Sequence, residues 1–465
     1  MGEVAKAVPS SHKFQTAVIH APRYRYTAFY PQTNSTSLQT SATNTNSVIF
    51  TIPNIPINFS KSWISWTDRE EAATNANKTV TCKAIDCFPI QQIQLATRTG
   101  KVLVEVNEFK QWSQIVRWLN MDIQKYRTCN IRDALTTTHG ARGDVNKPRA
   151  TVYNGPPANN AISRGLEESM YCVVSGNGEG MTLPYRVFLG DACPYTLLAL
   201  PQDMIFREDL LLKVTFCPYD QVRWAINNGS SDPNDGPAIK TSATAGLGSF
   251  LTDIQLNLAV QTNADLVNAL VKEMGANFIL SIPFIYSERQ TYAQTVTHVA
   301  PTKSISMAHG QLLRWVLTCG YDGADALNTA NDCSNEEYLA NTRRITSYNT
   351  QLNSENLQPG LVVCNNADDY KLNYPYMMRS PIGLDIQTYN SRWFHLDAFD
   401  DTRGAGNGQS TLAKESIVGG IPLYAQGKYH TFNATLPAVR SSTIIQWFCV
   451  QRTLNIKSNG MIDIV

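Results

Sequence analysis

The sequence has few charged residues for its length. Asp, Glu, Lys and Arg make up 17% of the 465 residues, below the roughly 25% that is typical of soluble proteins, and the formal net charge is +1. A chain this close to neutral is not expected to bind DNA or RNA over its whole surface, although a local basic face is compatible with the composition. Asn, Thr, Ser and Gln take the place of charged residues, and a neutral polar surface suits wide contacts between copies of a protein.

The chain also lacks targeting and membrane signals. The start, MGEVAKAVPSSHKF, has no basic stretch followed by an apolar core, which predicts synthesis in the cytosol without a signal peptide. No apolar run approaches the ~18 residues needed to cross a bilayer, so we expect a soluble chain. Lys6 stands where the myristoylation pattern requires Ser or Thr, which argues against lipidation.

A CxxC pair and a neighbouring His at metal-ligand spacing are missing as well. The ten cysteines are scattered singly, without a CxxC motif, and we interpret them as thiols. Cys217 and Cys449 stand in apolar runs and are predicted to be small core residues. The glycosylation sequons need a secretory route and are expected to stay unmodified; they lie at Asn34, Asn58, Asn77, Asn228 and Asn433.

What the sequence does contain is a succession of short β-patterns separated by turn residues. In DLLLKVTF, the residues Leu210, Leu212, Val214 and Phe216 alternate as a half-buried strand requires. The stretch IQQIQLATRTGKVLVEV predicts two strands joined at Thr99-Gly100. Near the carboxyl terminus, Asn459-Gly460 between alternating segments predicts a hairpin.

Two segments have helical periodicity instead. In the first, Phe109, Trp112, Val116 and Leu119 recur at three- and four-residue spacing, with Asn107 as the predicted cap, and the helix is expected to lie on a sheet. The second runs from Asn263, its predicted cap, to Gly275. Its apolar stripe consists of Leu266, Val267, Leu270, Val271 and Met274.

These patterns predict an all-β protein with a few short helices, built from two tandem β-sandwiches. Residues 1–45 are interpreted as an extended arm. Its aromatic residues either anchor it beneath a neighbouring subunit or pack it on its own domain; they are Tyr24, Tyr26, Phe29 and Tyr30. The first sandwich is predicted over residues 46–235 and the second over 236–465, because the Gly-, Pro- and Asn-rich stretch at about 227–249 is the best linker candidate.

No catalytic, cofactor-binding or metal-binding residue is predicted. The chain contains neither a GxSxG elbow nor HExxH spacing. His395 stands near Asp397, Asp400 and Asp401, a combination that suits metal ligation, but we favour a strand end followed by a polar loop because the spacing does not imply converging ligands.

Three further motifs are interpreted as ordinary loop sequence. The glycine-rich segments at 176–180 and 404–408 do not match a phosphate-binding pattern and are predicted to be turns. The tripeptide Arg142-Gly143-Asp144 matches an integrin-binding motif, and chance is the better explanation.

By blocks of hydrophobic pattern and turn residues, the chain resembles the double jelly-roll major capsid proteins of Polinton-like viruses, virophages and adintoviruses. The first half contributes PIQQIQLATRTGKVLVEVNEFKQW and LPQDMIFREDLLLKVTF. The second half contributes DIQLNLAVQTNADLVNALVKE, IPFIYSERQTY, RRITSYNTQLNSENLQP and the region from LYAQGKYHTF to LNIKSNGMIDIV. Together these blocks cover most of residues 47–465.

The resemblance implies two jelly rolls in each subunit, and a pseudo-hexagonal homotrimer that tiles an icosahedral shell around double-stranded DNA. It implies trimer-trimer contacts, minor capsid and penton proteins as partners, and either an inner membrane or packaged DNA on the inner face. No cofactor, small-molecule substrate or enzymatic activity is expected, and the location would be the virion. The alternative from another class is a tandem β-sandwich that binds or cleaves carbohydrate, with exposed Trp and Tyr stacking on sugars.

Overall fold

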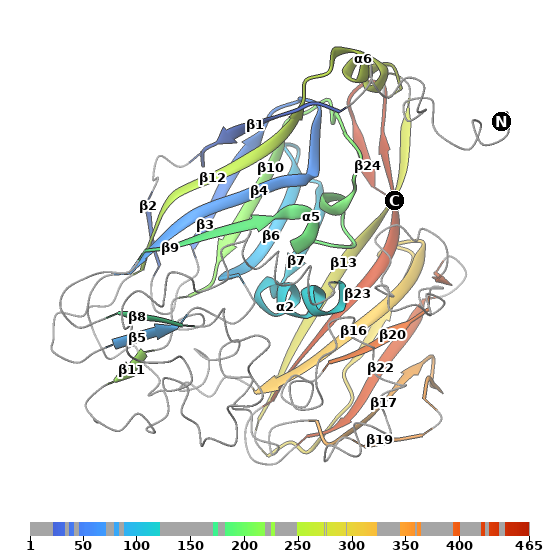
Figure 1. Ribbon diagram of the computed structural model, residues 1–465. Coiled ribbons are helices and arrows are strands. Elements are labelled where there is room, and N and C mark those ends of the chain that lie inside the picture. Colours follow the sequence, from blue (N-terminus) through green and yellow to red (C-terminus); the bar gives the residue numbers. More distant parts are fainter. Residues whose placement is uncertain are drawn as a thin grey trace, which may run out of the picture.

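A computed structural model of the chain describes residues 22–32, 37–40, 46–70, 79–82, 88–120, 171–174, 182–218, 225–227, 249–273, 275, 277–293, 295–322, 345–358, 360–363, 394–399, 420–423, 427–436 and 442–464. Within these residues the chain is mostly β-structure with a few short helices, which confirms the predicted fold class. Figure 1 shows two β-sandwiches, with blue to yellow-green strands in the first and yellow to red strands in the second.

The first sandwich consists of two antiparallel sheets. One has the order β1 (Tyr24–Phe29), β12 (Ser249–Gln261), β4 (Ile57–Glu70) and β9 (Thr182–Phe188), and β2 (Ser37–Thr40) also pairs with β12. The other has the order β3 (Asn46–Ile52), β10 (Leu210–Phe216), β6 (Ile90–Thr97) and β7 (Val102–Asn107).

The second sandwich repeats this design with its own strands. Its first sheet has the order β13 (Phe278–Tyr292), β23 (Ser442–Ile456), β16 (Leu312–Asp322) and β20 (Phe394–Ala398), extended by β21 (Ile421–Pro422) and β24 (Ile462–Ile464). Its second sheet centres on β22 (Lys428–Thr435) and β17 (Ser347–Leu352). The edges are β14 (His298–Val299) and β15 (Thr302–Ile305) on β22, and β18 (Glu355–Asn356) and β19 (Val362–Val363) on β17.

Both sandwiches have the same topology. For this comparison, the eight main strands of each sandwich are numbered 1 to 8 in chain order, and β14 with β15, and β18 with β19, each count as one strand. In both sandwiches the strands of one sheet then lie in the order 1-8-3-6, and those of the other sheet in the order 2-7-4-5. Eight strands in two sheets with this crossing pattern form a jelly roll. The described residues therefore form two jelly rolls in tandem, as predicted.

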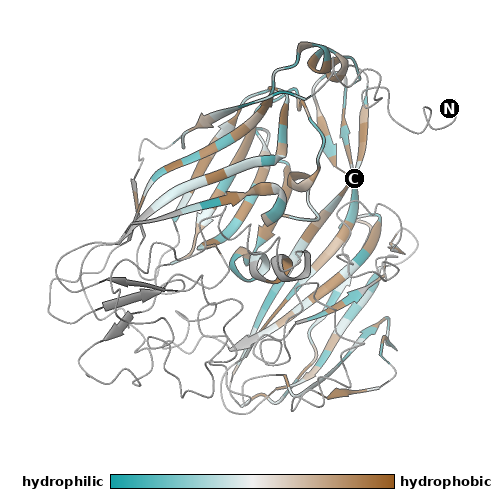
Figure 2. Cartoon of the chain, in the orientation of Figure 1, coloured by the Kyte–Doolittle hydropathy of each residue, from teal (hydrophilic) through white to brown (hydrophobic). Residues whose placement is uncertain are grey.

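Alternating side chains build the sandwiches. In β10, Leu210, Leu212, Val214 and Phe216 are buried, whereas the residues between them are partly exposed, as the sequence predicts. Apolar and polar residues alternate along many strands in Figure 2. Strand β23 is one exception, because its residues from Ser442 to Gln451 are all buried, and β16 is another, with Leu313 to Cys319 all buried. A strand that is buried on both faces has a sheet on one side and another layer of protein on the other.

Local signals in the sequence placed several turns correctly. Gly100 lies between β6 and β7 with φ of 92°, and Gly460 lies between β23 and β24 with φ of 85°, a region that favours glycine. Cys217 and Cys449 are buried among apolar residues, as predicted. No helix in the described ranges is long and apolar enough to cross a membrane.

The longer helices are α2 (Phe109–Asn120) and α6 (Ala264–Glu273), accompanied by the short α5 (Leu189–Ala192) and the 3-10 turn η5 (Leu197–Ala199). The predicted cap of α6 is confirmed, because Asn263 Oδ1 accepts the Asp265 amide at 3.1 Å. The predicted cap of α2 is one residue too early. Asn107 is the last residue of β7, and the carbonyl of Glu108 accepts the first helical bond, from Trp112 N at 3.0 Å.

The predicted domain limits need correction in the light of the strand pairing. Strand β1, inside the predicted arm of residues 1–45, pairs with β12 from Tyr24 opposite Gln261 to Phe29 opposite Leu256. Strand β12, inside the predicted second sandwich, pairs with β4 of the first. The range 46–235 thus omits the first and eighth strands of the first jelly roll, and the chain passes to the second after Gln261. For its described residues, the arm packs on its own domain.

The linker prediction failed because Gly-, Pro- and Asn-rich composition marks a long loop without saying what the loop connects. Residues 228–248 lie outside the described ranges. In the chain they stand between β11 (Ala225–Asn227) and β12, the last strand of the first sandwich. Strand β11 forms a small sheet with β5 (Thr79–Cys82) and β8 (Tyr171–Val174). Figure 1 places this sheet at the end of the molecule opposite α6, the helix that connects the two jelly rolls.

Candidate functional site

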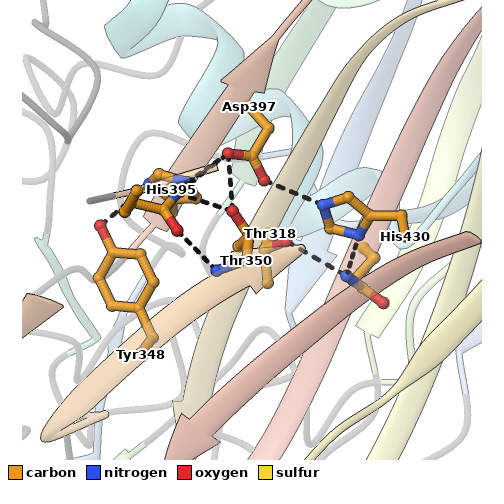
Figure 3. Close-up of polar contacts among 8 residues, drawn as sticks. Thr318, Tyr348, Thr350, His395, Asp397 and His430 are labelled. Carbon is orange, nitrogen blue, oxygen red and sulfur yellow. Dashed lines mark hydrogen bonds and ion pairs between the residues drawn. The ribbon is translucent and has the colours of Figure 1, made fainter. Parts of the chain in front are cut away.

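A buried network of polar side chains lies inside the second jelly roll (Figure 3). Its centre is Asp397, whose Oδ1 accepts hydrogen bonds from His395 Nε2 and Thr350 Oγ1, both at 2.9 Å. The other carboxylate oxygen, Oδ2, accepts from His430 Nε2 at 2.9 Å. An ionised carboxylate can only accept, so each histidine presents an Nε2–H to it.

Both sheets of the sandwich supply members of the network. His395 and Asp397 are two residues apart on β20 and therefore share its inward face, whereas Thr350 on β17 and His430 on β22 belong to the facing sheet. Gln358 closes the network by accepting from Thr350 N at 2.6 Å and donating to Thr350 Oγ1 at 2.7 Å. The network therefore ties the two sheets together across the core.

Two further contacts reach the other ring nitrogens of the histidines. Tyr348 Oη lies 3.0 Å from His395 Nδ1, and Gln446 Nε2 lies 3.5 Å from His430 Nδ1. Because the Gln446 amide nitrogen donates, His430 Nδ1 is placed to accept from it, while His430 Nε2 donates to Asp397. Burial alone raises the pKa of Asp397, but the charge and hydrogen bonds of His395 and His430 outweigh it and hold that pKa well below its usual range.

The arrangement is structural in character. Asp397 is 3% exposed, and His395 and His430 are at least as deeply buried, so no substrate reaches them. The Nε2 atoms of both histidines point at the carboxylate between them rather than at a shared vacant position. Among the described residues, no group of three or more His, Cys, Asp or Glu side chains is placed to hold a metal ion.

The strand end predicted for this segment is present, because β20 ends at Ala398, but the burial of His395 and Asp397 was not predicted. His395 and Asp397 lie within β20 and face the core, where each satisfies the hydrogen-bonding needs of the other. Asp400 and Asp401 lie outside the described residues. The two-residue spacing of His395 and Asp397 in a strand was the available signal, since it puts both on one face.

The other sequence motifs are dispersed. The tripeptide 142–144, the glycine-rich segments 176–180 and 404–408, and the sequons at Asn34, Asn77 and Asn228 lie outside the described residues. Asn58 is fully buried and donates to Asp203 Oδ1 at 2.9 Å, so its side chain is inaccessible. Asn433 is half-buried and donates to Asn349 Oδ1 at 3.0 Å.

Sequence patterns did not reveal the aromatic seam between the two jelly rolls. Trp112 of α2 lies against Trp315 of β16 and Trp447 of β23, with ring centroids 6.0 and 5.7 Å apart. Tyr195 meets Trp315 edge-on at 5.3 Å, and Trp447 Nε1 donates to the Asn107 carbonyl at 3.2 Å. This seam explains why β23 is buried on both faces, because the second jelly roll lies on one side and α2 on the other.

A polar pocket of about 460 Å³ opens beside this seam. Its lining includes Gln92, Asn107 and Glu108 of the first jelly roll and Ser287 and Arg289 of the second. Glu108 is the one carboxylate that lines it, and it pairs with Arg289 at 3.3 Å. A glycosidase needs two carboxyl groups roughly 5 to 9.5 Å apart, which this lining does not supply.

The fold defined by these two sandwiches and their seam is the double jelly roll. No protein-family model and no curated protein match the chain. Among solved structures, the chain is similar to a chain of the Sputnik virophage, with a TM-score of 0.50, 10% identity and coverage of 95% of this chain and 88% of that chain. That likeness supports the fold.

Two further solved structures match with lower TM-scores. The mavirus major capsid protein has a TM-score of 0.45, 9% identity and coverage of 98% of this chain and 94% of that chain. A chain of Sulfolobus Turreted Icosahedral Virus has a TM-score of 0.39, 10% identity and coverage of 91% and 90%.

Proposed function

We propose that this protein is a viral major capsid protein whose function is assembly. The observation that carries the proposal is the duplication: two jelly rolls with the same strand order lie side by side, and an aromatic seam joins them. A capsomer built from such chains presents two similar blocks per subunit. The likeness in fold to a chain of the Sputnik virophage agrees with this role.

Three copies of such a chain form a pseudo-hexagonal homotrimer with six similar sandwiches. A ring closed by symmetry buries subunit edges without leaving an open contact that would polymerise into fibres. The trimers tile an icosahedral shell around double-stranded DNA through trimer-trimer contacts. Minor capsid and penton proteins are the further partners, and the inner face meets either a membrane or the packaged DNA.

The protein acts without catalysis in this proposal and resides in the virion after synthesis in the host cytoplasm. The charged network around Asp397 supports a structural role, because it is sealed in the core and binds the two sheets to each other. Its contribution is to the rigidity of the building block.

Sedimentation of the purified protein tests the proposal directly. We expect a species near three times 51.6 kDa with a hexagonal outline in negative-stain electron microscopy. Shells formed by the trimers at higher concentration would extend the result to assembly. A stable monomer at micromolar concentration that binds or cleaves oligosaccharides would overturn the capsid role in favour of the carbohydrate-directed alternative.

A further inference from the structure

The duplication allows the two jelly rolls of one chain to be compared with each other. In each, the third strand lies beside the eighth and carries a tryptophan on the outer face of the sheet. Trp63 of β4 stands opposite Asn257 of β12, and Trp315 of β16 stands opposite Cys449 of β23. The two tryptophans therefore occupy corresponding strands and the same face.

Their surroundings differ. Trp315 is fully buried, because Trp112 and Tyr195 of the first jelly roll cover it. The covering surface consists of the fifth strand β7, the helix α2 that follows it, and the turn around Tyr195. This is the contact by which the first jelly roll packs on the second within one chain.

On the corresponding face of the first jelly roll, aromatic side chains stay partly exposed. Tyr26 of β1, Trp63 of β4 and Phe188 of β9 form a continuous aromatic row, with successive ring centroids 4.8 and 5.3 Å apart. Tyr26 is 52% exposed, and Trp63 and Phe188 are each partly exposed. Arg186 lies beside the row, 6.0 Å from the Trp63 ring.

In the second jelly roll, exposed leucines flank the fifth strand, which corresponds to β7 of the covering surface. Leu357 follows β18 directly and Leu361 precedes β19 directly, and β18 and β19 together count as the fifth strand. The two leucines are 37% and 63% exposed. Glu355 of β18 is exposed next to them. The aromatic row with Arg186 and the leucines with Glu355 thus match in apolar character and are opposite in charge.

The geometry points to a docking contact between copies of this chain: the Tyr26-Trp63-Phe188 row of one copy receives the Leu357-Leu361 surface of the next. This contact repeats between chains the packing of β7 and α2 on Trp315 within a chain. It is heterologous, so each copy contributes one surface to one neighbour and the other surface to the next, and three copies form a closed ring when each is rotated by a third of a turn. The inference rests on the proposed capsomer and specifies which surfaces join its subunits.

Charge substitutions at the two surfaces test the contact. Trp63→Asp and Leu361→Asp should each convert the trimer into monomer in sedimentation, with association weakened roughly thirtyfold or more, as for a buried hot-spot residue. Ile279→Asp is the matched control, because Ile279 is 64% exposed and lies on β13, which carries neither surface. It should remain trimeric.

Mixing the two variants gives a sharper readout. The Trp63→Asp chain keeps its leucine surface and the Leu361→Asp chain keeps its aromatic row, so an equimolar mixture should form a dimer near twice 51.6 kDa that cannot close into a ring. Circular dichroism of each variant checks that it is folded. Should Trp63→Asp misfold, hydroxyl-radical labelling of Tyr26 in the wild-type protein replaces it, and labelling should fall severalfold on oligomerisation.

The outcomes distinguish a failure of the proposed capsid function from a failure of the docking contact. A wild-type protein that stays monomeric overturns the proposed function together with the contact. A wild-type trimer that both variants preserve, or a Tyr26 labelled equally in monomer and trimer, overturns the contact alone. Binding of oligosaccharides that is lost in Trp63→Asp would assign the aromatic row to sugars instead of a second copy.

Discussion

Replacing Asp397 by asparagine removes the charge at the centre of the buried network and leaves its shape. The new amide oxygen can still accept from His395 and Thr350, whereas the new amide nitrogen faces the Nε2–H of His430, so two donors meet. His430 can avoid this clash only by moving its proton to Nδ1, where the Gln446 amide nitrogen donates. Either way one buried donor loses its acceptor.

The expected loss of stability is large because the site is buried. Removing one partner of a buried charged pair destabilises proteins by about 3–5 kcal/mol, and we expect Asp397→Asn to lower the free energy of unfolding by about that amount. Urea unfolding followed by tryptophan fluorescence measures it. Asp463→Asn is the matched control, since Asp463 pairs with Lys101 and Lys457 at the surface and its loss should change stability little.

The network also predicts a pH dependence. The pKa of Asp397 in the folded protein is below its usual value of 3.8, so its stabilising effect is complete above that value and is lost as the pH falls further through the folded pKa. The stability difference between wild type and Asp397→Asn should be constant above about pH 5 and shrink below pH 4. Equal effects of Asp397→Asn and Asp463→Asn, or a difference independent of acid pH, would refute the reasoning.

Three further substitutions test the seam, the first strand and the last turn. Trp112→Ala removes the ring that packs on Trp315 and Trp447, so it should lower the free energy of unfolding by about 3–5 kcal/mol. Calorimetric unfolding should then split into two transitions, and a single unshifted transition would contradict this role of Trp112. Asp203→Ala removes the acceptor of Tyr24 Oη and Gln261 Nε2, so the β1 amides should exchange hydrogen about tenfold faster while those of β6 do not change. Gly460→Ala should cost about 1–2 kcal/mol because φ is positive, whereas Gly360→Ala, with open space around it, should leave the melting temperature unchanged.

Elements whose signals are local were predictable from the sequence. The alternation in β10, the glycine turns at Gly100 and Gly460, and the Asn263 cap each depend on residues within a few positions of one another. Hydrogen bonds and steric limits at that range act in the same way in any fold. The presence of two sandwiches followed from the number and spacing of such signals.

The candidate site was only half visible in the sequence. His395 was noticed for its acidic neighbours, and one of these, Asp397, is its partner, whereas the other partners of Asp397, His430 and Thr350, lie on strands far away in the chain. Whether a His and an Asp on one face of a strand point into the core or out to solvent depends on which face the opposite sheet covers. No periodicity within β20 contains that information.

The sequence by itself therefore determined many of the strands, several turns and the all-β class, because local backbone preferences and side-chain alternation act over a few residues. Only the tertiary structure decided that β1 and β12 complete the first jelly roll, that the Gly-rich stretch precedes the last strand of that jelly roll, and that Trp315 is fully buried while Trp63 stays partly exposed. These outcomes arise from contacts between residues hundreds of positions apart, where burial of apolar surface between whole sheets outweighs any local preference.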